Sequence, residues 1–174
     1  CLSPQDDFES SAGLPRDEYA TPFKDLRFND EPVVLHHEPR AHTDGDTIVY
    51  FPRSDVVSTG DIFTPGGYPF IDVANGGSVN GEIAALNHIL DLTVPGHTQE
   101  GGTYVVPGHG RICDEADVVE YRDMVVIVRD RVQDAIKKGM TLEQVQAAAP
   151  SRDYDSAYVT PTSFVKAADF VAAI

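Results

Sequence analysis

Positive charge is scarce in this 174-residue chain, which has 13 Lys and Arg against 28 Asp and Glu and a formal net charge of −15. A surface this acidic repels phosphate, which argues against binding to nucleic acid or to anionic membranes. No segment approaches the ~18 apolar residues that a transmembrane helix needs. Cysteine is also sparse: Cys1 and Cys113 cannot form a disulfide framework, and they leave the redox compartment open.

The first ten residues, CLSPQDDFES, lack an initiator Met and the basic and apolar regions of a signal peptide. Cys1 is either the first residue of a mature lipoprotein or an internal residue of a longer parent protein, and we expect the second. A parent could carry a leader upstream, so periplasmic, secreted and cytoplasmic locations stay open. We expect residues 1–22 to be irregular and residues 23–174 to form the folded part.

Short apolar segments bounded by Pro, Gly and Asp predict strands in the first part of the fold. Leu26 and Phe28 alternate with polar neighbours, as in an edge strand. Further strands are predicted at 33–35, 47–51, 55–59 and 103–106. Several of these are nearly continuous apolar runs, which is typical of strands covered on both faces.

Helical periodicity begins after Ser78, a suitable N-cap, where Val79, Ile83 and Leu86 start one apolar stripe. The longest helix is predicted at 114–138. A capping-box pattern predicts a short helix from Thr141 to Pro150.

Thr160-Pro161 predicts the start of the last helix, with Phe164, Ala168 and Val171 on its inner side. Strands come first and then alternate with helices, so the fold class is α/β or α+β.

Three segments place a metal-capable side chain in a loop next to a predicted strand. His42 lies in AHTDGD between two strands, Asp61 follows STG, and His109 follows VVPG. His nitrogen and Asp oxygen are donors that suit zinc. Each residue alone could be an ordinary loop His or a turn Asp. The matching contexts together favour a metal site whose ligands meet through the fold.

HTDGD, STGDIF and VVPGHG, in this order, resemble the C-terminal half of a metallo-β-lactamase-fold hydrolase. The segments GGYPFID and GGSVNGEIAALNHILDL resemble a bacterial branch of that superfamily. The resemblance covers roughly residues 23–150. It implies an αββα sandwich with its site at one rim of two packed sheets.

The resemblance also implies roles for the three residues. His42 would complete the three-His site of a first zinc, Asp61 would be the catalytic carboxylate bridging two metals, and His109 would bind the second zinc. One or two zinc ions would supply a bound hydroxide that attacks a carbonyl or similar centre. Iron stays possible, since His and Asp ligands serve it as well.

The His-x-His-x-Asp-His signature of the superfamily is absent from the sequence. His36 and His37 are clustered but adjacent, and in a strand they would point to opposite faces. The chain therefore resembles a C-terminal half that begins after this motif. We expect weak or no activity from it alone. We also expect an apolar sheet face over residues 24–59, covered by a missing N-terminal half or by a second copy in a dimer.

Three functions stay open: a zinc hydrolase of a small-molecule ester, thioester, lactone or lactam, an incomplete half-domain that binds a partner, or an iron-dependent dioxygenase of the same fold. Near the expected site, Asp44 and Asp46 could orient His42, although turn formation around Gly45 explains them equally well.

Five further residues have expected positions. Tyr68, Asp72 and Ser78 could line a substrate pocket, although such loops also simply connect elements. We expect His88 to be exposed to solvent, and Cys113 to be a buried, inert thiol.

Overall fold

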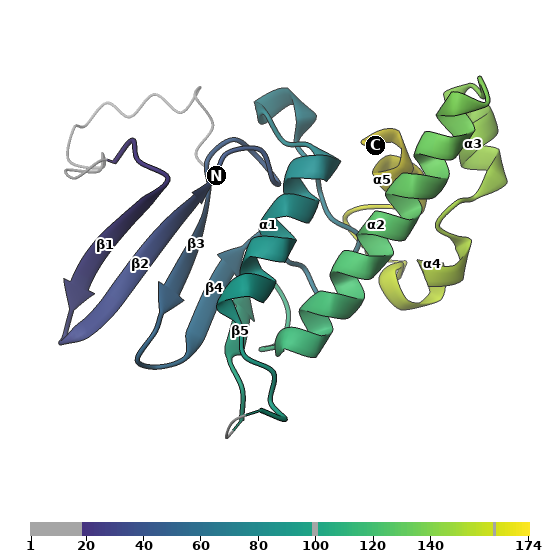
Figure 1. Cartoon of the computed structure of the whole chain (residues 1–174). Coiled ribbons are helices and arrows are strands. Elements are labelled where there is room, and N and C mark those ends of the chain that lie inside the picture. Colours follow the sequence, from purple (N-terminus) through teal and green to yellow (C-terminus); the bar gives the residue numbers. More distant parts are fainter. Residues whose placement is uncertain (1–18, 99–100, 162) are drawn as a thin grey trace.

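The computed structural model describes residues 19–98, 101–161 and 163–174, and its centre is a five-stranded sheet in the order β1-β2-β3-β4-β5 (Figure 1). The strands are β1 (Phe23–Phe28), β2 (Glu31–Glu38), β3 (Asp46–Phe51), β4 (Val56–Gly60) and β5 (Tyr104–Pro107). The first four are antiparallel neighbours, and β5 pairs with β4 in parallel. All five predicted strands are present, and β1 is an edge strand as expected.

The parallel pair β4–β5 requires a crossover connection, and helix α1 (Val79–Leu92) lies within it. α1 packs beside α2 (Glu115–Lys137), and Figure 1 shows these two helices running together past the sheet. Ser78 caps α1 by accepting a hydrogen bond from the Gly81 N–H, as predicted. Asp114 caps α2 through a capping box with Asp117. These local signals explain why both helices begin where the sequence indicates.

The main core lies between the sheet and these two helices. Ile48, Val57 and Val105 contribute the sheet side, and Leu86 and Val125 contribute from α1 and α2. All five side chains are fully buried. The apolar stripes that predicted both helices are therefore buried in this core.

The C-terminal region differs from the prediction. α3 (Leu142–Ala148) has the predicted capping box, but α4 (Arg152–Tyr158) was not predicted, since its seven residues are too few to show a helical period. α5 (Ala167–Ala172) begins well after Thr160-Pro161.

The predicted buried face of the last helix is also wrong in part. Val171 is buried, whereas Ala168 is exposed and Phe164, which precedes the helix, is 83% exposed. Phe170 is the aromatic residue that enters the core. Pro161 would suit the first turn of a helix. The helix nevertheless begins at Ala167, and its residues Phe170 and Val171 are the ones buried in the core.

The second face of the sheet has no helix packed on it in the described part of the chain. The strand pairing puts Leu26 opposite Val33 and Leu35 opposite Val49, all on the face away from α1 and α2. Leu26 is 40% and Phe28 70% exposed on that face. The sheet therefore has an apolar face away from its helices. No helix in the described residues has the length and apolarity to cross a membrane.

Candidate metal site at the strand ends

Three loops meet at one edge of the sheet because β2, β4 and β5 all run in the same direction. The loop after β2 carries His42, the turn after β4 carries Asp61, and the loop after β5 carries His109. The three side chains line one cavity of about 500 Å³. Residues separated by 19 and 48 positions in the sequence thus line one cavity.

His42 is the buried member of the three, with only 6% of its surface exposed. Its Nδ1 lies 3.3 Å from Asp46 Oδ1, and the Thr43 backbone N–H donates to Asp46 Oδ2 at 2.6 Å. The hydrogen bond to Asp46 raises the pKa of His42, against the opposing effect of burial. A carboxylate that holds one ring nitrogen fixes the orientation of the imidazole, as it does for many metal-binding histidines.

The backbone around His42 is held by the N-terminus of α1. The Ser78 N–H bonds to the carbonyls of Arg40 and Ala41 at 3.0 Å each. A Cβ on Gly81 would collide with the Arg40 carbonyl, so only glycine allows the helix to approach this closely. The segment GGSVNG is therefore needed to position the His42 loop.

Asp61 and His109 are brought together by close backbone contact between the ends of β4 and β5. The Gly108 N–H donates to the Gly60 carbonyl at 2.7 Å, and a Cβ on Gly108 would collide with the Asp61 carboxylate. His109 Nε2 lies 3.4 Å from Asp61 Oδ1. These side chains are 76% and 39% exposed, so solvent screens their attraction.

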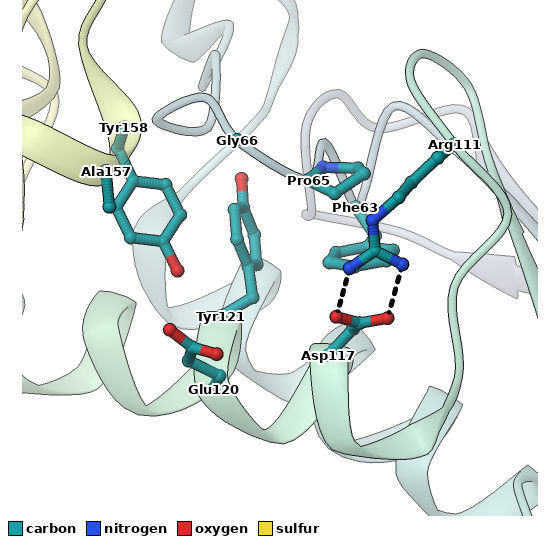
Figure 2. Close-up of a pocket in the computed structure, with 9 residues that line it drawn as sticks. All are labelled: Phe63, Pro65, Gly66, Arg111, Asp117, Glu120, Tyr121, Ala157 and Tyr158. Carbon is teal, nitrogen blue, oxygen red and sulfur yellow. Dashed lines mark hydrogen bonds and ion pairs between the residues drawn. The ribbon is translucent and has the colours of Figure 1, made fainter.

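The loop that carries His109 closes on itself and is pinned to α2. Val105 and Cys113 exchange two backbone hydrogen bonds. Beyond them the Arg111 guanidinium forms a two-pronged pair with Asp117, which Figure 2 shows. This hydrogen-bonded pairing lowers the pKa of Asp117. The pair forms one wall of a second cavity of about 340 Å³, which adjoins the first along Pro65 and Gly66.

Glu82 was missed by sequence analysis, although it lies within α1 behind this site. It is fully buried, and neither carboxylate oxygen has a hydrogen-bond partner among the described residues. Burial, together with the charges of Asp46 and Asp61, raises its pKa well above the usual value. The signal was present: Glu82 stands three residues after Val79 and four before Leu86, within the apolar stripe.

The residues expected around the site fall into two groups. Asp46 contacts His42, and Tyr68 lines the cavity with its hydroxyl 2.8 Å from Asp155 Oδ1. The cavity lining does not include Asp44, Asp72 or Ser78. These residues form hydrogen bonds that hold the neighbouring loops in place. Asp72 caps the short 3₁₀ helix η2 (Val73–Asn75), and the Asp44 N–H bonds to the Asn75 carbonyl.

The expectation for His88 is wrong. Its side chain is only 35% exposed, its Nδ1 lies 2.6 Å from Glu38 Oε1, and its ring meets the ring of His36 edge-on at 4.7 Å. The helical periodicity could not predict the contact between His88 and Glu38, because it depends on where β2 lies next to α1. Cys113 is buried as expected, and burial raises the pKa of its thiol to about 11.

The donor chemistry of the cavity suits a zinc ion, but the set is incomplete. Two imidazoles and a carboxylate line it, and His42 already has a carboxylate behind it. Across the described residues, however, no three His, Cys, Asp or Glu side chains are grouped so that they could hold a metal ion. Catalytic zinc usually has three protein ligands. The described residues alone therefore do not form a complete metal site.

Comparison with known proteins supports the fold. No family model and no curated protein matches the sequence. Among solved structures, the chain is similar to the inverting sec-alkylsulfatase Pisa1 from Pseudomonas sp., with a TM-score of 0.66 and 13% identity over 92% of this chain. A double mutant of the same sulfatase gives a TM-score of 0.68.

A metallo-β-lactamase from Pontibacter korlensis is similar over 66% of the chain, with a TM-score of 0.51 and 16% identity. The mixed α/β architecture of the chain is thus similar to the fold of this metallo-β-lactamase and of the sulfatase. The chain spans only about a quarter of the sulfatase (26%) and half of the lactamase (50%).

Proposed function

We propose that this chain is the C-terminal part of a zinc-dependent hydrolase of metallo-β-lactamase fold. The observation that supports this most directly is the meeting of His42, Asp61 and His109 in one cavity from three separate strand ends. His42 would bind one zinc ion, His109 a second, and Asp61 would contact both. Zinc held there would make hydroxide available at neutral pH for hydrolysis of an ester, thioester, lactone or lactam, because a zinc-bound water has a pKa near ~7.

The remaining ligands would come from outside residues 19–174. The short coverage of the sulfatase and lactamase chains is consistent with this, as is the apolar sheet face away from α1 and α2. Either an N-terminal half or a second copy of the chain would cover that face. In an αββα sandwich, this is the face on which the second sheet packs.

Zinc titration with a matched variant tests the metal site. The chain is dialysed against chelator, mixed with zinc, and its bound metal counted. We expect weak binding that His42→Ala and Asp61→Asn abolish, while His97→Ala, which changes an exposed loop His, leaves it unchanged. Equal loss in all three variants, or none, would exclude the assignment. Iron that binds in preference to zinc would favour the dioxygenase.

Turnover tests the incompleteness of the site. With zinc added, the chain alone should stay near background on a lactam, a lactone, a thioester and a phosphodiester. A rate within tenfold of a typical enzyme's ~10 s⁻¹ would refute the proposal that the chain carries only part of the active site. Activity that returns when an N-terminal half carrying His-x-His-x-Asp-His is added would support it.

The second candidate is a half-domain that associates without catalysis, and the exposed Leu26 and Phe28 favour it. Sedimentation at micromolar concentration should show self-association through the β1–β3 region. At physiological salt, screening over ~8 Å limits the repulsion of the acidic surface. A monodisperse monomer that binds no apolar dye would contradict both this candidate and the missing half.

A further inference from the structure

We infer that the cavity beside His42 is a binding subsite for an uncharged aromatic or bulky alkyl group, and that Phe70 and Phe164 select it. The inference rests on the proposed hydrolase function, because it assigns this group to the substrate of the same site. The proposed subsite would bind the part of the substrate that does not react.

A continuous line of rings leads from the candidate ligand into the cavity. The His42 ring lies 5.7 Å from the Phe70 ring, and Phe70 lies 5.3 Å from Phe164 in an edge-to-face arrangement. Phe70 is 44% and Phe164 83% exposed, so their surfaces are open to a ligand. A substrate whose reacting centre lies near His42 would place its organic part against these rings.

The rest of the lining is uncharged. Apart from the three candidate metal ligands, the only ionisable side chain that lines the cavity among the described residues is Tyr68. The Tyr68 hydroxyl is already engaged by Asp155 and by the Ser151 carbonyl, and its buried ring stacks on Tyr158 and Phe170, so it offers the cavity no free polar group. Pro65 and Val165 add further apolar surface. A charged group placed here would lose its hydration without gaining a partner.

The size of the cavity sets the scale of the group. A volume of about 500 Å³ is within the range of ligand sites, roughly 300–1,000 Å³. It accommodates a fused aromatic ring system together with the reacting group. The two phenylalanines come from the loop after β4 and from the segment before α5, so the C-terminal region takes part in selecting the substrate.

Ligand binding to the metal-free chain tests this without any need for turnover. The probes are 2-acetonaphthone and acetone, two neutral methyl ketones that differ only in the aromatic group. Amide NMR shifts of residues 68–71 and 163–165 should saturate with 2-acetonaphthone and stay unchanged with acetone at equal concentration. A sulfonate on the far ring of the naphthyl probe should weaken binding at least tenfold.

Three variants give the matched comparison. Phe70→Ala and Phe164→Ala should each weaken binding of 2-acetonaphthone roughly threefold to tenfold, the loss expected for one aromatic contact. Phe28→Ala removes a ring that is 70% exposed on β1, at the opposite edge of the sheet from β5, and at protein concentrations below self-association it should leave binding unchanged.

An equal effect of Phe28→Ala, or shifts that do not saturate, would overturn the subsite. So would shifts at these amides that follow protein concentration rather than probe, because a second copy would then occupy the cavity. Because no metal is present, loss of the subsite would leave the hydrolase proposal standing. A failed zinc titration would in turn leave this measurement valid.

Discussion

The two sides of the cavity are built differently. His42 is 6% exposed and is held by Asp46 and by the N-terminus of α1, all within this chain. His109 is 76% exposed, and it lies against the partly exposed Asp61. The side chain of His42 is thus held in one orientation by buried contacts, whereas the side chain of His109 is largely open to solvent.

The same contrast appears in the use of glycine. Gly81 lets a helix approach the His42 loop, and Gly108 lets two strand ends approach each other at Asp61. The first contact is buried under α1, whereas the second lies at an open edge. Changes at the buried side should therefore cost more folding energy than changes at the exposed side, and the four predictions below test this in order of size.

The largest effect is expected from Gly81→Val. The new side chain would collide with the Arg40 carbonyl and push α1 away from the His42 loop. We expect a loss of about 3–5 kcal/mol in the free energy of unfolding, at the upper end for overpacking of a rigid contact. Urea denaturation measures it. Gly67→Val is the control, because a Cβ there meets only Thr64 at 3.6 Å; equal losses would mean that the helix–loop contact is soft.

Glu82→Leu changes a buried residue of α1 that lies behind the His42 side of the cavity. An ionised Glu82 has no partner among the described residues, so an apolar residue of similar size should stabilise the chain by about 1–3 kcal/mol at pH 7. The folded pKa of Glu82 is raised above its unfolded value, so wild-type stability falls as pH rises from ~4.3 toward the folded pKa.

The gain from Glu82→Leu should therefore be small at pH 4 and grow toward pH 7. Glu82→Gln is the control: it removes the charge but leaves a buried polar group, and it should gain less. Thermal unfolding at both pH values is the measurement. A destabilised Glu82→Leu at pH 7 would mean that a bound water or cation satisfies the carboxylate.

Sequence patterns predicted the sheet, α1 and α2 because these elements have regular apolar periods and strong caps at Ser78 and Asp114. They also indicated three of the side chains that line the cavity, because each lies in a loop next to a strand, and Asp61 and His109 directly follow a glycine. They failed where tertiary contact decides: α5 starts at Ala167, and His88 meets Glu38 across 50 positions. Glu82 is buried, as its place within the apolar stripe of α1 indicates.

Asp117→Asn tests the exposed side through the support of the His109 loop. It removes the charge that pairs with Arg111 and weakens the capping box of α2, so we expect a loss of about 1 kcal/mol. The pKa of Asp117 is lowered in the fold, so its contribution is present above ~3.9 and is lost as pH falls through the folded value.

The measurement for Asp117→Asn is urea denaturation at pH 7 and pH 3, where the difference from wild type should shrink at the lower pH. Asp123→Asn, on the same helix and paired at the surface with its neighbour Arg122, is the control and should change little. A loss as large as that of Gly81→Val would remove the distinction between the two sides.

The smallest effect is expected from Glu38→Gln, next to the contact of β2 with α1. The hydrogen bond to Glu38 raises the pKa of His88, so this pair adds stability that is full below ~6.5 and is lost as pH rises through the folded pKa. Because His88 is partly exposed, we expect only about 0.5 kcal/mol, seen at pH 5.5 and reduced at pH 8.5. The pKa of His36 is lowered by burial and by its neighbour His88, which limits the total pH effect. Glu31→Gln, on the same strand and bonded to the Ser54 N–H, should show no such pH dependence. If both variants respond to pH alike, the His88–Glu38 pair does not couple β2 to the helix that supports His42.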